Sequence, residues 1–157
     1  MRAPAILTLS VFFLCTAGLA ADVANLNGVW KLNLKKSKYQ KNAAPLSVEL
    51  KIEHNEPSLS YSGSVTATQE SQPDTFEFRG AIDEKIYPVK QNKKTGRTIK
   101  FKRQSPRTVE SWSSDDTMEE HALMTVSANG KTLIRKMHVK QKNGAVRDWT
   151  EVYDKQG

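Results

Sequence analysis

Apolar and polar residues alternate one by one along most of the chain after Gly28, and turn-forming residues interrupt this alternation every 8 to 14 residues or so. A period of two places successive side chains on opposite faces of a β-strand. A shorter run at 86–89 contains Pro88 and fits an edge strand. The pattern predicts an all-β chain with strands near 30–34, 48–53, 59–66, 76–82, 86–89, 98–103, 108–113, 118–128, 132–140 and 145–154.

Two Asn-Gly pairs, Asn129-Gly130 and Asn143-Gly144, predict tight hairpin turns between the last three strands, because both central residues of a type I′ turn need positive φ. Short strands joined by such turns form an up-and-down antiparallel meander of about 9–10 strands. Closure into a barrel removes the exposed edges, so a barrel is expected, with a two-sheet sandwich as the alternative. We expect one domain over 22–157.

Two-residue turns at both pairs place position 126 opposite 133 and position 135 opposite 152. In this register the interior face is largely apolar, and it includes Met118, Glu120, Ala122, Met124, Val126, Leu133, Arg135, Met137, Val139, Val146, Asp148, Thr150 and Val152. The same register leaves Trp149 and Tyr153 outside. A bulge that reverses the last strand would turn Arg147, Trp149 and Tyr153 inward instead.

The inward position of Arg135, with Thr150 diagonal to it, makes Arg135 a candidate anchor for a carboxylate or another anion. A charged group that faces inward is costly unless it is paired, hydrated or used by a ligand. The alternative is that these positions lie near a barrel mouth and are hydrated.

Residues 1–20 have the layout of a secretory signal peptide: Arg2, an apolar run from Ala5 to Leu14, and small residues up to Ala20. We therefore expect export to the periplasm or secretion. Cys15 is the only cysteine and lies in this segment, so the mature chain is expected to contain no disulfide and no thiolate site.

The chain has 24 basic and 17 acidic residues, a net charge of +7. A balance of this kind is compatible with an anionic envelope surface as a partner, while export argues against nucleic acid. The lysines between Lys31 and Lys41 are expected mainly on an outward face. No oligomeric state is implied.

Candidate chemistry other than ligand binding is sparse. His54, His121 and His138 lie on three different predicted strands without metal-ligand spacing, and neither a Gly-x-Ser-x-Gly turn nor a phosphate-binding glycine loop occurs. We expect no metal, no cofactor and no enzymatic activity.

The Gly28-Val29-Trp30 start of the first strand resembles the lipocalin and fatty-acid-binding (calycin) barrels. The fuller string "GVWKLNLKKSKY", with "YPV" at 87–89 and "VYDKQ" at 152–156, is similar to a group of uncharacterised exported bacterial proteins of lipocalin-like type. A Thr-Asp-Tyr motif of true lipocalins is missing. The resemblance implies a structural role for Gly28 and Trp30 at a barrel floor, with Arg135 or Arg147 packed on the tryptophan.

The resemblance also implies a small lipophilic or amphipathic ligand. Gly63, Gly80 and Ala122 would leave room for it, and Arg135 with Thr150 would meet its head group. The expected lining is Leu50, Ile52, Tyr61, Phe76, Phe78, Ile99, Phe101 and Met124. The alternative is a module with a filled core that uses its basic outer face on anionic polymers or protein partners. The two hypotheses differ in whether a cavity exists.

Overall fold

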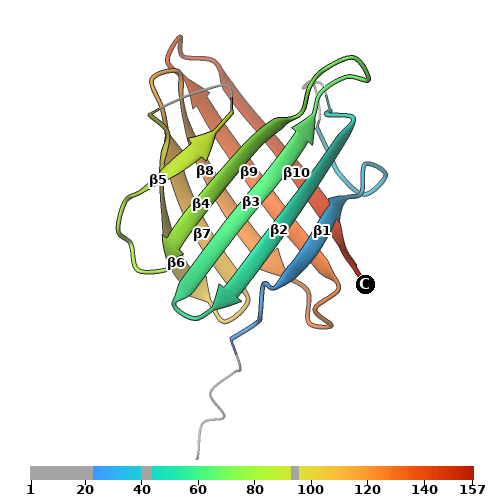
Figure 1. The fold of residues 1–157 in the computed structure, drawn as a ribbon, viewed down its shortest axis with the longest axis vertical. Coiled ribbons are helices and arrows are strands. Elements are labelled where there is room, and N and C mark those ends of the chain that lie inside the picture. Colours follow the sequence, from blue (N-terminus) through green and yellow to red (C-terminus); the bar gives the residue numbers. More distant parts are fainter. Residues whose placement is uncertain (1–22, 40–43, 93–95) are drawn as a thin grey trace, which may run out of the picture.

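The computed structural model describes residues 23–39, 44–92 and 96–157 (Figure 1). The proposed signal peptide at 1–20 lies outside these residues. These residues contain no helix, and so none that is long and apolar enough to cross a membrane. The strands are β1 (Gly28–Leu32), β2 (Ser47–Asn55), β3 (Ser58–Thr66), β4 (Asp74–Ala81), β5 (Tyr87–Gln91), β6 (Thr98–Ser105), β7 (Thr108–Ser114), β8 (Met118–Val126), β9 (Thr132–Gln141) and β10 (Val146–Gln156).

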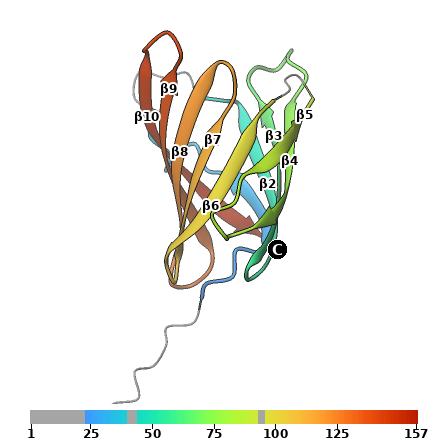
Figure 2. The same ribbon diagram turned by 90° about the vertical axis from the view of Figure 1, so that its left-hand side faces the viewer.

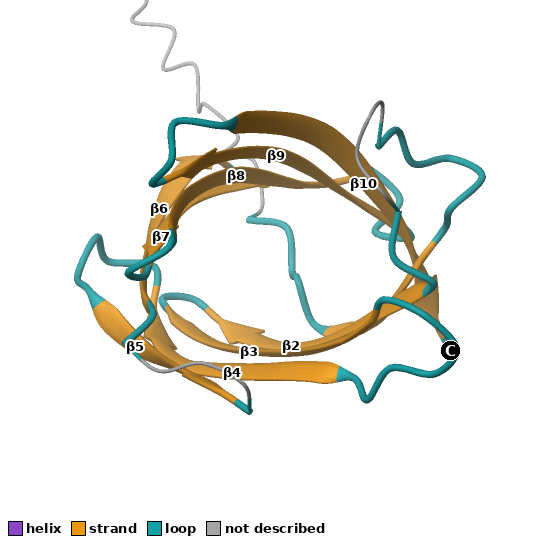
Figure 3. Ribbon diagram, turned by 90° about the horizontal axis from the view of Figure 1, so that it is seen from above, coloured by secondary structure: helices purple, strands orange, loops and turns teal. Residues whose placement is uncertain are grey.

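The ten strands form one closed antiparallel barrel in which each strand pairs with its neighbours in sequence. β1 and β10 complete the ring, with Trp30 opposite Lys155 and Leu32 opposite Tyr153. Seen from above, the strands form a ring (Figure 3). The predicted all-β, up-and-down barrel is confirmed, and the sandwich alternative is wrong. Pairing is shortest between β5 and β6, where only Tyr87 and Pro88 have partners.

The predicted register is correct for β8 and β9, where Val126 lies opposite Leu133. The loop that joins them is longer than a two-residue turn, since Ser127 N–H donates to the carbonyl of Thr132. Gly130 has a positive φ but Asn129 does not, so the turn is not type I′. A loop of four residues keeps the same pairs as a loop of two, which is why the register holds.

The predicted register is wrong for β9 and β10. Gln141 N–H donates to the carbonyl of Ala145, so the loop contains the three residues 142–144. Gly144 alone has the positive φ that this loop needs. Arg135 therefore lies opposite Glu151 instead of Val152.

This one-residue shift exchanges the two faces of β10. Arg147, Trp149, Glu151 and Tyr153 face the barrel interior, whereas Val146, Asp148 and Thr150 lie on the other face. Thr150 exchanges backbone hydrogen bonds with Lys38. The alternative orientation of the last strand is the one observed, although a loop one residue longer produces it and no bulge is needed.

One end of the barrel is closed by large apolar side chains. Trp30 and Tyr153 are fully buried there. Other buried residues at this end are Ile52, Leu59, Val109, Val126 and Leu133. Figure 2 shows the chain entering at this lower end, where the strands converge.

The segment before β1 crosses this closed end and is held there by its backbone. Leu26 is 1% exposed, its carbonyl accepts a hydrogen bond from Trp30 Nε1 at 2.9 Å, and its N–H donates to His54 Nδ1 at 3.3 Å. The cation over the Trp30 ring is Lys155, 5.3 Å from the ring centre, and neither of the two expected arginines takes this place. Gly28 has a φ of +139°, which favours glycine at the start of β1.

Candidate functional site

The other end of the barrel holds a cavity of about 550 Å³. Loops β1–β2 and β3–β4 and the start of β10 line its outer part through Tyr39, Pro45, Ala67 and Arg147. Seven of the expected ligand-binding residues line it: Tyr61, Phe76, Phe78, Ile99, Phe101, Met124 and Arg135. Thr150 does not, because it lies on the opposite face of β10. Leu50 and Ile52 are buried in the floor rather than exposed to the cavity.

One wall, from β3 to β6, is mainly aromatic. The rings of Tyr61 and Phe76 lie 5.3 Å apart, and those of Phe78 and Phe101 lie 5.0 Å apart. A Cβ at Gly63 would come within 2.2 Å of Phe76 Cζ, so the glycine accommodates Phe76. A Cβ at Gly80 would likewise meet Tyr87 and Phe78. These two glycines let the aromatic wall pack and do not leave room for a ligand, contrary to expectation.

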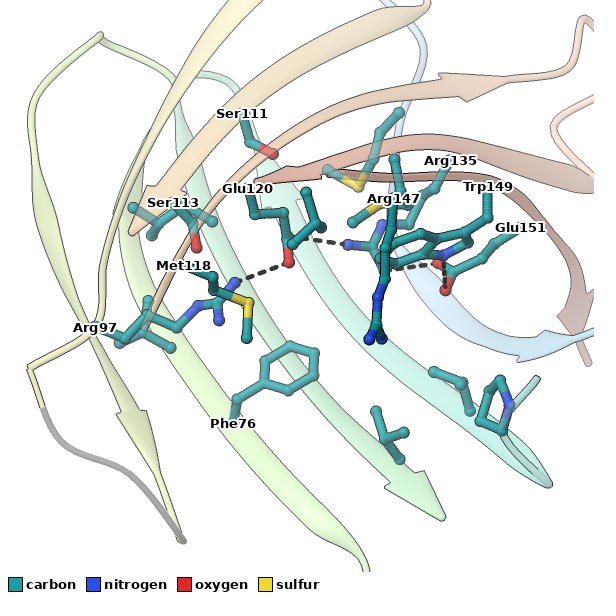
Figure 4. Close-up of a pocket in the computed structure, with 18 of the residues that line it drawn as sticks. Phe76, Arg97, Ser111, Ser113, Met118, Glu120, Arg135, Arg147, Trp149 and Glu151 are labelled. Atoms are coloured by element: carbon teal, nitrogen blue, oxygen red, sulfur yellow. Dashed lines mark hydrogen bonds and ion pairs between the residues drawn. The ribbon is translucent and has the colours of Figure 1, made fainter. Parts of the chain in front are cut away.

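The opposite wall, mainly on β7 to β10, carries the charged groups (Figure 4). Arg135 Nη1 lies 3.0 Å from Glu151 Oε2, and Arg135 Nη2 lies 3.8 Å from Glu120 Oε1. Arg97 Nη2 lies 2.8 Å from the other oxygen of Glu120, and Arg97 Nη1 lies 3.4 Å from Asp115. Two arginines and three carboxylates therefore form one continuous network along this wall.

Glu151 is the most completely paired member of this network. Arg135 and the hydroxyl of Tyr153 donate to its Oε2, at 3.0 and 2.8 Å. Trp149 Nε1 and the hydroxyl of Tyr39 donate to its Oε1, at 2.9 and 3.3 Å. Burial, and then the nearby carboxylate, raises the pKa of Tyr39 above its ordinary value. With four donors around it, Glu151 has little capacity left for a ligand.

Asp115 is held in a different way at the β7–β8 turn. Burial alone would raise its pKa, but hydrogen bonds from the Thr117 hydroxyl and from two backbone N–H groups, together with Arg97, lower that pKa. The carboxylate thus stays ionised and fixes the turn beside Arg97.

Within the described part of the chain, four buried polar atoms of the cavity lining have no hydrogen-bond partner: Tyr61 Oη, Gln91 Oε1, Ser113 Oγ and Arg135 Nε. Tyr61 and Ser113 are 6% and 5% exposed. Burial raises the pKa of Tyr61 to about 12, so its hydroxyl is neutral at ordinary pH and can donate or accept. Such atoms are uncommon in folded proteins, and here they face one space.

Arg147 lines the outer part of the cavity and is exposed to solvent. Within 23–39, 44–92 and 96–157 its guanidinium has no ion pair and no hydrogen bond. Figure 4 shows the side chain extending into the pocket beside Trp149. Arg147 therefore differs from Arg97 and Arg135, which are both paired.

Sequence reasoning found the aromatic wall and Arg135 but missed Glu151, Trp149 and Arg97 as members of the site. Arg97 precedes the predicted strand at 98–103, so the alternation of apolar and polar residues did not indicate that it faces inward. The signal for the β10 residues was present, since the assumed register left Trp149 and Tyr153 outside. Burying those two aromatics requires the face that the structure shows.

The histidines do not converge. Each lies beside a different carboxylate, with His54 Nε2 2.7 Å from Glu56, His121 Nε2 2.6 Å from Glu110 and His138 Nδ1 2.7 Å from Asp148. In the described segments no group of three or more His, Cys, Asp or Glu side chains is arranged to hold a metal ion.

Fold and site together define a closed antiparallel β-barrel with an internal cavity that has one aromatic and one charged wall. No family model matches the chain, and no curated protein matches it.

Proposed function

We propose that this protein is a lipocalin-like barrel that binds one small amphipathic molecule in its cavity. The observation that carries the proposal is the set of four unpartnered polar atoms, Tyr61 Oη, Gln91 Oε1, Ser113 Oγ and Arg135 Nε, in a buried space faced by aromatic rings. The resemblance of the Gly28-x-Trp30 start to calycin barrels supports the same class.

The dimensions and chemistry of the cavity support a ligand of ordinary metabolite or lipid size. A volume of about 550 Å³ falls within the range of small-molecule sites, which is roughly 300–1,000 Å³. Aromatic faces from Phe76, Phe78 and Phe101 favour an apolar body. A buried polar group without a partner costs about 1–3 kcal/mol, so a ligand with hydroxyl or carbonyl groups would gain by pairing with them.

The alternative of a solid interaction module is less well supported. A filled core would leave space for no more than a few waters, whereas the cavity here is of ligand size. The signal-like segment at 1–20 supports a protein exported to the periplasm or secreted. The proposal is one of binding and assigns no catalytic step to these residues.

A matched pair of substitutions tests whether binding occurs inside the barrel. Ser113 faces the cavity and the adjacent Ser114 faces outward, so Ser113→Trp fills the space and Ser114→Trp does not. Titration with N-phenylnaphthylamine, an uncharged fluorescent probe, is expected to saturate at one site in the wild type. Affinity should fall about tenfold or more in Ser113→Trp, because a ring then occupies the pocket, and remain unchanged in Ser114→Trp.

Circular dichroism and urea unfolding of both variants would show that each is folded. Two results would contradict the proposal: no saturable binding of neutral or anionic amphipaths by the wild type, or equal binding by Ser113→Trp and Ser114→Trp.

A further inference from the structure

The charged wall of the cavity is already paired except at one position. Arg97 is matched by Asp115 and Glu120, and Arg135 is matched by Glu120 and Glu151, at distances between 2.8 and 3.8 Å. A ligand acid placed against either of these arginines would also lie close to carboxylates that they hold. Like charges at such distances repel each other, and the low dielectric of a buried site strengthens the repulsion.

Arg135 has little left to offer a second anion. Its Nη1 is shared between Glu151 and the hydroxyl of Tyr153, and its side chain is 12% exposed. Burial opposes its charge, but the nearby carboxylates of Glu151 and Glu120 help to raise its pKa above the ordinary value, so the cation is stabilised by its present neighbours. Only its Nε lacks a partner, and a neutral acceptor on a ligand suffices to fill that position.

Arg147 has the opposite properties. It lies where the cavity meets solvent, has no partner among the described residues, and stands beside the ring of Trp149 (Figure 4). A guanidinium binds carboxylate, sulfonate or phosphate oxygens through paired N–H donors. An acid group held there also stays partly hydrated, which avoids the cost of burying its charge.

We propose that the ligand is an anionic amphipath bound with its acid group outward at Arg147 and its apolar body inward against Phe76, Phe78 and Phe101. This inference rests on the proposed function and adds the charge and the direction of the ligand. Arg135 is then a positioning residue that orders Glu151 and its three other donors, and it is not the anchor for the acid. The sequence-based expectation had given the anchoring role to Arg135.

The body of this ligand is expected to carry at least one neutral hydrogen-bonding group. Tyr61 Oη and Ser113 Oγ are buried without partners on the two sides of the cavity. A hydroxyl or carbonyl group in the ligand can pair with either of them. The class is therefore an acid with an apolar, oxygen-bearing body, and a cation would be repelled by the uncompensated guanidinium of Arg147 at the entrance.

The test compares one probe in two charge states. Dansylamino-undecanoic acid and its methyl ester differ at the acid group alone, and both report binding by fluorescence. The wild type is expected to bind the acid about tenfold more tightly than the ester, as a charge-assisted hydrogen bond implies. Arg147→Gln should remove this preference, so that the acid and the ester bind the variant with equal affinity. Arg79→Gln, on the outer face of β4 with its side chain 81% exposed, is the matched control and should behave as wild type.

Orientation is read from the same experiment. With the acid outward, the dansyl group lies between the two walls, so its emission should shift to the blue relative to water. A preference for the acid that survives in Arg147→Gln overturns the proposal. So does an acid complex whose dansyl group emits as it does in water, because the acid would then point inward.

The two proposals fail in different ways. If acid and ester bind the wild type equally while N-phenylnaphthylamine still binds, the charge assignment is wrong and the binding function stands. If none of the three probes binds, the binding function itself is wrong.

Discussion

The two ends of this barrel are built from the same alternating strands but are filled differently. At the closed end, Trp30, Tyr153 and Leu26 are 0–1% exposed, and the Trp30 indole N–H has a partner in the Leu26 carbonyl. At the open end Trp149 is half-buried, and neither Arg147 nor the buried Ser113 hydroxyl has a partner among the residues that the structure describes. Folding alone accounts for the first arrangement but not for the second.

The difference separates residues that specify the fold from residues that are available for a ligand. Stability depends on close packing and on paired polar groups. Among the described residues, the closed end has one buried side-chain polar atom without a partner, Arg103 Nη1 beside His54, whereas the cavity has four. Space and unpaired donors reduce stability, so their concentration at one end indicates a binding role there. The network around Glu151 lies between the two ends. Its groups are paired with one another, and they also line the cavity.

The largest expected effect contrasts the tryptophans of the two ends. Trp30→Ala should lower the free energy of unfolding by about 3–5 kcal/mol, because it leaves a large cavity in the floor. Trp149→Ala should cost about 1 kcal/mol, mainly from the lost hydrogen bond to Glu151. Urea unfolding followed by circular dichroism measures both. Equal losses would show that the two ends do not differ in their contribution to the free energy of unfolding.

A second prediction asks whether the Glu151 network belongs to the fold. Glu151→Ala leaves the Arg135 guanidinium, 12% exposed, with Glu120 as its one remaining carboxylate at 3.8 Å. The free energy of unfolding should fall by about 3 kcal/mol. Asp148→Ala on the opposite face of the same strand is the control and should change it by less than about 1 kcal/mol, since the Asp148–His138 pair is exposed. If both changes are equally small, the network serves the ligand site alone.

The smallest expected effects distinguish two buried tyrosines. Tyr153→Phe should lower the free energy of unfolding by about 1.5 kcal/mol, since the hydroxyl donates to Glu151 at 2.8 Å. Tyr61→Phe removes a hydroxyl that has no partner, so stability should stay the same or rise by about 1 kcal/mol or less. Urea unfolding near neutral pH gives both values. A large loss in Tyr61→Phe would mean that its hydroxyl is paired in solution.

The change in unfolding free energy at alkaline pH provides a second test of the environment of Tyr61. Burial raises its pKa from 10.0 to about 12 in the folded protein, so between these values the unfolded chain binds fewer protons than the folded one. Stability must therefore fall as pH rises through this window. Tyr153, whose pKa burial also raises, acts in the same direction. The slope of unfolding free energy against pH should be shallower in Tyr61→Phe, and an unchanged slope would contradict the raised pKa.

The fold could be predicted because its main signal is local. Alternation over β2, where every second residue from Val48 to His54 is buried, follows directly from the pleat of a strand. The aromatic wall followed from the same alternation in β3, β4 and β6. Closure could be predicted because a closed barrel leaves no exposed strand edge. The pairing of β1 with β10 closes this barrel.

The charged wall could not be predicted in full, because it depends on the length of one loop. Asn-Gly is compatible with turns of different length, and Asn143-Gly144 forms a three-residue loop where two residues had been assumed. That single residue decides whether Val152 or Glu151 lies opposite Arg135. The pairing of Arg97 with Glu120 joins β8 to the segment just before β6, and no sequence period reports such a contact.

The closure of the ring also bears on how the chain folds. Trp30 pairs with Lys155, so the contacts that shut the barrel join residues far apart in sequence, whereas the hairpins β2–β3 and β8–β9 join near neighbours. Bringing distant segments together costs more chain entropy and is slower than forming a local hairpin. The floor around Trp30 is thus the part of the molecule whose assembly must wait for the last strand, and the cavity above it takes its shape only when that strand is in place.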